Sequence, residues 1–269
     1  MLRYRIMENK NLKEDNMIKN SSRVDFSLPE KLDCQFAGRR KAAFTLAEVL
    51  ITLGIIGIVA AMTLPALIAN HQKTQTATRL KRAYNVISNA IQQAKSEHGD
   101  VELWELSSSN DIQASSDFAN TYLIPYMNVI KKCDTSITDD CTYKPTSMKG
   151  TNLGNLPLHT RFVLNDGTLI FIQSRVNDAE HVFPRIVYVN IDINGFKGPN
   201  ISGKDYFQFA VVLDTTQDMY RFAMHRLYAS GQSQTIETIR ENCSRNGSGG
   251  YCAALIMYNN WRITDDYPW

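Results

Sequence analysis

The sequence lacks the short motifs that mark common catalytic and nucleotide-binding sites. It has no glycine-rich phosphate loop, no H-E-x-x-H zinc motif and no G-x-S-x-G nucleophile turn. Its histidines show no metal-ligand spacing either; they are His71, His98, His159, His181 and His225. We therefore expect a protein that is not an enzyme and that has no catalytic residues.

A basic excess is missing from the long C-terminal part of the chain. Residues 1–43 hold ten Lys/Arg against six Asp/Glu, whereas residues 44–269 hold nineteen against twenty-one. A general nucleic-acid binder needs a basic surface. Nucleic acid is therefore not an expected partner.

Cysteine is scarce and unevenly placed. Cys34 precedes the main apolar segment, and Cys133, Cys141, Cys243 and Cys252 follow it. If the later part is exported, an even number of cysteines fits an oxidising compartment, and the short spacings favour the pairs Cys133–Cys141 and Cys243–Cys252. Four free, buried thiols are the alternative. A zinc site is disfavoured, because no two cysteines have C-x2-C spacing.

One long uncharged run lies within KAAFTLAEVLITLGIIGIVAAMTLPALI, residues 41–68. Its 19 residues from Leu50 to Ile68 carry no charge and are enough to cross a bilayer core of about 30 Å at about 1.5 Å per residue. Arg39, Arg40 and Lys41 precede the run. The positive-inside tendency therefore predicts a single pass with the N-terminus in the cytoplasm and the C-terminus outside.

Glu48 is a carboxylate at the start of this run. A charged side chain costs a few kcal/mol in hydrocarbon unless it is paired or neutralised, so Glu48 needs a partner. The alternative is an interfacial carboxylate that stays hydrated near the lipid headgroups.

The helix is expected to continue beyond the membrane segment, from Phe44 to His98, with Gly99 as its stop. Pro65 removes a backbone donor inside it, so a bend is expected there. The second half is amphipathic and should pack against the rest of the protein through an apolar stripe formed by Ala77, Leu80, Tyr84, Ile87, Ile91 and Ala94.

The remaining residues predict a small antiparallel sheet of four or five strands. A short helix is expected within residues 115–133, capped by Ser115 or Ser116 and interrupted by Pro125. A loop follows at 134–158, and a hairpin over Arg161–Gln173 turns at Asn165-Asp166-Gly167. Further strands are expected at 185–191, 205–213 and 219–227, then a helix at 237–243 and an apolar run of uncertain type at 251–261.

Residues Phe44 to Pro65 resemble the N-terminal signature of the type IV pilin and type II secretion pseudopilin superfamily. Basic residues precede the small residue Ala43, Phe44 follows it, and Glu48 is the fifth residue counted from Phe44. The family usually has glycine where this chain has Ala43. The resemblance implies an α+β, pilin-like fold, in which one long helix packs on a small antiparallel sheet.

The resemblance also implies how the N-terminus is processed. A prepilin peptidase would cut between Ala43 and Phe44 and then methylate the new amine of Phe44. In the assembled filament, Glu48 would face the Phe44 amine of a neighbouring subunit and fix the axial register between subunits. This supplies the partner that the carboxylate needs.

The implied layout has four parts. They are a cleaved cytoplasmic leader (1–43), a transmembrane and filament-core helix (44–69), its amphipathic continuation (70–99) and an extracytoplasmic globular head (100–269). The expected partners are the prepilin peptidase, identical or related pilin subunits, the inner-membrane assembly platform and, before assembly, membrane lipid. The C-terminal cysteine pair of such heads often frames a variable surface, so partner contacts are expected around residues 244–251.

The resemblance predicts a structural subunit of a type IV pilus or a type II secretion pseudopilus, held in the inner membrane and then moved into a filament. Two alternatives remain open. One is a minor pilin whose head binds a surface or takes up DNA. The other is an anchored extracytoplasmic domain that forms no filament.

A weaker pattern concerns calcium. Asp192, Asn194 and Asp205 have the carboxylate and amide oxygens that calcium prefers, and some pseudopilin heads bind this ion. The favoured alternative is a turn in which Asp192 and Asn194 bond their own backbone and Gly195 adopts a positive φ.

Overall fold

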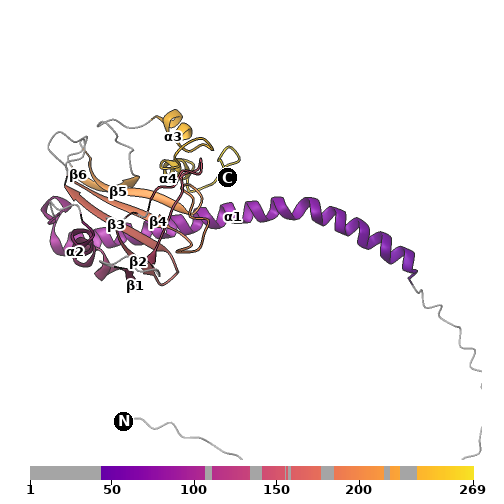
Figure 1. The fold of residues 1–269 in the computed structure, drawn as a ribbon, viewed down its shortest axis with the longest axis horizontal. Helices are drawn as coiled ribbons and strands as arrows, with labels where there is room; N and C mark the ends of the chain where they lie inside the picture. The colour runs from indigo at the N-terminus through magenta and orange to yellow at the C-terminus, as the bar shows by residue number, and fades with distance from the viewer. Residues whose placement is uncertain are drawn as a thin grey trace, which may run out of the picture. The chain divides into compact units, whose positions relative to one another are not determined.

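The computed structural model describes residues 44–106, 111–133, 141–154, 156, 159–176, 185–214, 219–224 and 235–269. Its architecture is α+β and pilin-like, with a long N-terminal helix followed by an antiparallel sheet and short C-terminal helices (Figure 1). The fold class expected from the sequence is confirmed. The leader, Cys34, Ala43, His181 and His225 lie outside the described residues.

Helix α1 extends over Leu46–His98 and continues through Pro65. Gly99 follows with a φ of 78°, the left-handed conformation that commonly ends a helix. The bend at Pro65 stays a prediction. The apolar stripe is confirmed, with Tyr84 half-buried; the buried residues of the helix are Thr76, Ala77, Leu80, Ala83, Ile87, Ala90, Ile91 and Ala94.

The stripe packs on one face of the sheet, as expected, and forms with it the main apolar core. The ring of Tyr84 lies 5.7 Å from that of Phe209 in the sheet and 5.2 Å from that of Trp261 near the C-terminus. Four of the buried helix residues are alanines. Small side chains let the helix backbone approach the bulky strand residues closely.

The sheet has six strands in the part of the chain that the structure describes, and each pairs antiparallel with its neighbour in sequence. This is more than the four or five strands predicted. The hairpin is confirmed: Gly167 has a φ of 85° and its N–H donates to the carbonyl of Leu164 over 2.9 Å. The strands are β1 (Val129–Cys133), β2 (Thr160–Leu164), β3 (Leu169–Val176), β4 (Arg185–Asp192), β5 (Tyr206–Asp214) and β6 (Met219–Met224).

The extra strand comes from a region predicted to be helical. Helix α2 spans Ile112–Tyr122, and Asp111 caps it by accepting from the N–H of Ala114 over 2.7 Å. The prediction of Ser115 or Ser116 as the cap was therefore wrong. Pro125 lies in a 3-10 turn (η2, Ile124–Tyr126), after which the β-branched residues of β1 form the edge strand.

The second face of the sheet is also covered. Tyr143 packs against Phe171 and Tyr206, with its ring centroid 4.6 Å and 5.8 Å from theirs. Tyr143 belongs to a segment that forms no long strand of its own; its Thr146 bridges to Asn152 and Ile201. Both faces of the central strands are consequently buried.

Two short helices follow β6. Helix α3 (Ile236–Asn242) confirms the predicted helix at 237–243, and helix α4 (Cys252–Tyr258) settles the type of the C-terminal apolar run. A 3-10 turn, η1 (Val101–Leu103), joins α1 to the residues before α2. The residues of α4 from Cys252 to Ile256 are all buried in the main core.

Candidate functional site

Thr45 and Glu48 form a reciprocal cap at the start of α1. The N–H of Thr45 donates to Glu48 Oε2 over 2.8 Å, and the Thr45 hydroxyl donates to the same oxygen over 3.0 Å. The N–H of Glu48 in turn donates to Thr45 Oγ1 over 3.2 Å, which completes a capping box. The Glu48 carboxylate is therefore bound to the residue next to Phe44, the predicted new N-terminus.

The first part of α1 exposes its apolar side chains on every side. Phe44, for example, is 86% exposed. Apolar surface favours burial by about 25 cal/mol per Å², so lipid or protein must cover this segment. Among the described residues, α1 is the one helix long and apolar enough to cross a membrane. The exposed residues are Phe44, Leu46, Val49, Leu50, Ile51, Leu53, Ile55, Ile56, Ile58, Val59, Met62, Leu64, Leu67 and Ile68.

The predicted calcium residues lie in and beside the β4–β5 connection, where donors of the protein occupy their carboxylates. Asp192 Oδ1 accepts from the N–H of Asn194 over 2.9 Å, and Asp192 Oδ2 accepts from the Tyr143 hydroxyl. Gly195 has a φ of 76°. This is the geometry of the turn that the sequence favoured over an ion site.

Asp205 closes the same connection from its far end. Its carboxylate accepts from the N–H groups of Asn200, over 2.8 Å, and Ile201, and from Asn194 Nδ2 over 3.3 Å. No group of three or more His, Cys, Asp or Glu is placed to hold a metal in the described part of the chain. Calcium binding stays a prediction.

Burial changes the protonation of this pair. It raises the pKa of Asp192 to about 8, although the hydrogen bond from Tyr143 acts in the opposite direction and Asp205 adds to the rise. Burial also raises the pKa of Asp205, against hydrogen bonds from Ile201 and Asn200. Burial therefore favours the protonated form of Asp192.

Replacing Asp192 by Asn should flatten the dependence of stability on pH. Since the pKa of Asp192 is about 8 in the fold and that of an ordinary aspartate is 3.8, the folded chain binds this proton more tightly than the unfolded chain. The stabilising contribution of this proton is full below pH 3.8, and it is lost as the pH rises towards about 8. Urea unfolding of full-length protein in detergent, at several pH values across this window, measures the slope. Asp117→Asn, at an exposed site, is the control, and equal slopes for wild type and Asp192→Asn would contradict the prediction.

Arg161 is a buried cation that the sequence patterns did not reveal. It is 1% exposed, and its guanidinium donates to the carbonyls of Cys141 and Leu156 and lies 5.7 Å from the Phe171 ring centre. Through these two hydrogen bonds, Arg161 holds the segment around Tyr143, which covers the second face of the sheet, against strand β2. One sequence signal for a covered second face was available. The start of β3 is an uninterrupted apolar run, and such a run indicates a strand that is buried on both faces.

His159 is buried beside this cation. Burial first, and then the positive charge of Arg161, lower the pKa of His159 to about 4. Its Nε2 lies 3.3 Å from Asn190 Nδ2. A histidine that stays neutral at physiological pH, next to an amide, is a structural hydrogen-bonding partner here.

Both predicted disulfides are present: Cys133 is joined to Cys141, and Cys243 to Cys252. The alternative of four free thiols is wrong. The first bond ties the end of β1 to the segment that covers the sheet. These bonds fit an oxidising compartment.

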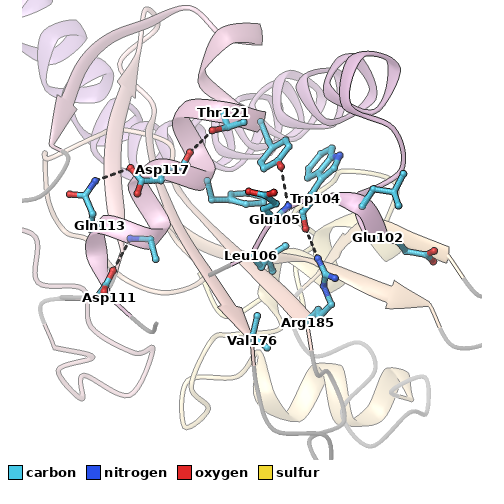
Figure 2. A pocket seen from close by; sticks show the side chains of 14 residues that line it. Glu102, Trp104, Glu105, Leu106, Asp111, Gln113, Asp117, Thr121, Val176 and Arg185 are labelled. Atoms are coloured by element: carbon cyan, nitrogen blue, oxygen red, sulfur yellow. Dashed lines mark hydrogen bonds between the residues drawn. The ribbon is translucent and has the colours of Figure 1, made fainter. Parts of the chain in front are cut away.

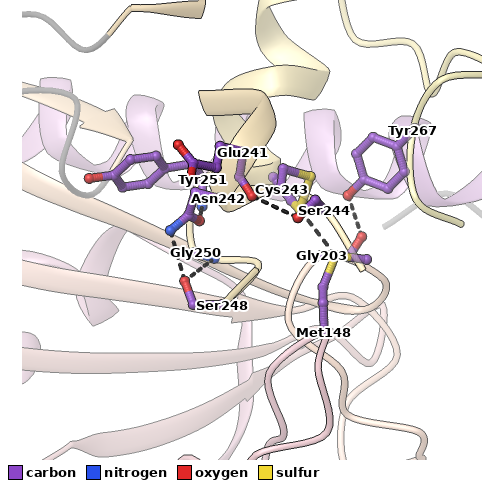
Figure 3. The surroundings of a disulfide bond; sticks show 11 residues. Met148, Gly203, Glu241, Asn242, Cys243, Ser244, Ser248, Gly250, Tyr251 and Tyr267 are labelled. Atoms are coloured by element: carbon purple, nitrogen blue, oxygen red, sulfur yellow. Dashed lines mark hydrogen bonds between the residues drawn. A yellow bond between two sulfur atoms is a disulfide. The ribbon is translucent and has the colours of Figure 1, made fainter. Parts of the chain in front are cut away.

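The second disulfide closes a loop that is largely fixed in place (Figure 3). Asn242 Oδ1 accepts from the N–H of Tyr251 over 2.8 Å, and Met148 Sδ lies 3.7 Å from Cys252 Sγ. Gly249 has a φ of 78°, and a Cβ there would lie 2.6 Å from the carbonyl oxygen of Ser202. The exposed residues of the loop, where partner contacts were expected, are Arg245, Asn246 and Ser248.

A pocket of about 880 Å³ lies between η1, α2 and the adjoining ends of β3 and β4 (Figure 2). Arg185 donates to the carbonyl of Trp104, and Gln113 Nε2 donates to Asp117 over 2.8 Å. The acidic side chains of its lining are Glu102, Glu105, Asp111 and Asp117.

Two family models match the chain. Residues 66–269 match a family described as a family of unknown function (DUF6613), and residues 38–64 match the prokaryotic N-terminal methylation motif. The second match confirms the pilin and pseudopilin signature. No curated protein and no solved structure matches the chain.

Proposed function

We propose that this chain, which belongs to the DUF6613 family of unknown function, is a structural subunit of a thin filament of the type IV pilus or type II secretion kind. The observation that carries the proposal is the N-terminal helix. Its first part, residues 46–69, is apolar on all sides and carries one carboxylate, Glu48, a single turn from the predicted cleavage point. An all-round apolar helix needs lipid before assembly, and a packed helical core would replace that lipid afterwards.

The proposed location follows from the same features. The basic residues before the apolar run favour an N-terminus in the cytoplasm, and the two disulfides favour a head outside it. The prepilin peptidase would act on the cytoplasmic side, at Ala43 and Phe44. The inner-membrane assembly platform would then move the subunit from the membrane into the filament.

Cleavage is the first step to test. Mass spectrometry of the N-terminal peptide from membrane-extracted protein should find a peptide that begins at N-methylated Phe44. Cells without the peptidase are the control and should keep the leader. An Ala43→Gly variant, with the residue usual in the family, should be cut at least as completely. An intact leader in cells with an active peptidase would contradict the proposal and favour an anchored domain that forms no filament.

A further inference from the structure

A polar pocket of about 290 Å³ lies between α1 and the β4–β5 connection, a short distance beyond the apolar segment. One wall is formed by Gln72, Gln75, Thr76 and Arg79 of α1. The other contains Lys204 and Asp205 from the β4–β5 connection, and the half-buried ring of Trp269 completes the lining. The pocket combines two cations with one carboxylate, that of Asp205, and with neutral donors and acceptors.

The two cations of this pocket have no bonded counter-charge. Two other basic side chains of α1 are paired: Lys73 lies 3.4 Å from Asp265, and Arg82 lies 3.3 Å from Asp166. Within the described residues, no ion pair or side-chain hydrogen bond involves Arg79 or Lys204.

Asp205, the acidic side chain of the pocket, is already engaged by the N–H groups of Asn200 and Ile201. Asn194, which also lines the pocket, has a buried Oδ1 without a hydrogen-bond donor. The pocket therefore offers two cations to an anion, while Asn194 Oδ1 lies beneath its surface.

The position of the pocket relative to the apolar segment favours a lipid headgroup. Gln72 lies four residues past Ile68 and Arg79 eleven, which is about 6 Å and about 16 Å along the helix. Helical side chains tilt towards the N-terminus of their helix, here towards the membrane. A tryptophan beside the cations suits a membrane interface.

We propose that Arg79 and Lys204 bind the phosphate of an anionic phospholipid while the subunit is anchored in the membrane, before assembly. The inference rests on the proposed membrane-anchored state. It gives a reason for basic residues just outside the membrane segment, where the positive-inside tendency disfavours them. The phosphate accepts from both cations. Release of the lipid would accompany extraction of the subunit into the filament.

The test uses full-length protein in nanodiscs of phosphatidylcholine with a minor fraction of phosphatidylglycerol. Native mass spectrometry measures which lipid stays bound when the subunit is released. Wild type should retain phosphatidylglycerol in preference to phosphatidylcholine. The Arg79→Gln/Lys204→Gln variant should lose this preference by about tenfold or more. Lys144→Gln/Lys149→Gln, which removes two exposed lysines from another part of the head, should leave it unchanged.

Soluble competitors identify the ligand. Inorganic phosphate and glycerol phosphate should displace little lipid at millimolar concentrations; full displacement by inorganic phosphate would overturn the lipid assignment. Equal lipid retention by wild type and the double variant would overturn the site. If that variant also lost filaments, the two cations would contact a neighbouring subunit instead. Lipid retention is measured without filaments, so failure of the assembly proposal gives a different result from failure of this one.

Discussion

Replacing Glu48 by Ala should leave the subunit in the membrane and abolish filament formation. The apolar run that inserts is unchanged, so insertion needs no carboxylate. In the filament core, the amine of Phe44 would lose its counter-charge, and an unpaired buried charge costs about 3–5 kcal/mol. Sheared filaments, measured by immunoblotting against the membrane fraction, should fall by about a hundredfold or more for a loss of this size.

The cap at the start of α1 provides a matched control. In the subunit, Glu48 accepts from both the N–H and the hydroxyl of Thr45. A Glu48→Gln variant keeps an acceptor for this cap but has no charge. It should assemble as poorly as Glu48→Ala if Glu48 pairs with a neighbour's amine. Normal filament yield from Glu48→Gln would show instead that the residue acts through the helix cap.

Replacing Arg161 by Met should strongly destabilise the head. The substitution keeps a long apolar side chain but leaves the buried carbonyl of Cys141 without its donor, and it leaves the half-buried carbonyl of Leu156 with the N–H of His159 alone. An unsatisfied buried group costs about 1–3 kcal/mol and a hydrogen bond from a charged group contributes about 1.5–3 kcal/mol, so we expect a loss of about 2–5 kcal/mol. Thermal unfolding of full-length protein in detergent, followed by tryptophan fluorescence, should show a Tm lower by about 10 °C.

Two further variants separate the causes. Arg161→Lys keeps the charge but cannot reach both carbonyls with one planar group, so it should recover only part of the stability. Arg262→Met removes an exposed guanidinium and should change the free energy of unfolding by less than about 0.5 kcal/mol. An Arg161→Met protein as stable as Arg262→Met would mean that the covering segment does not depend on this side chain.

The parts of the fold that follow from local periodicity were predictable. The 3.6-residue spacing from Ala77 to Ala94 gave the helix and the face it buries. The Asn165-Asp166-Gly167 turn gave the hairpin, because only a residue such as Gly167 readily adopts the φ that the turn requires. The short cysteine spacings favoured the two disulfides that are present.

What the sequence missed depends on contacts between distant segments. Residues 129–133 form a strand because they pair with β2. No pattern within those five residues predicts this pairing. The burial of Arg161 and Asp192 could not be read from the residues beside them for a related reason. They become buried because residues around Tyr143, 18 and 49 positions before them, cover the second face of the sheet.

The candidate site divides in the same way. Phe44 and Glu48 could be identified because the motif is continuous in sequence, and the methylation-motif match supports it. The pocket with Arg79 and Lys204 could not, because its two cations come from α1 and from the β4–β5 connection, 125 positions apart in the numbering.

The neighbour-to-neighbour order of the six strands has a consequence for folding after export. Each strand pairs with the one made just before it, so every pairing closes a fairly short loop. In the proposed topology, the second half of α1 leaves the membrane first, and each new hairpin can add to the growing sheet without waiting for the C-terminus. The contacts of α3 and α4, which the Cys243–Cys252 bond joins, form late, followed by those of the last residues, such as Tyr267. Oxidation of that pair would therefore mark a nearly completed head.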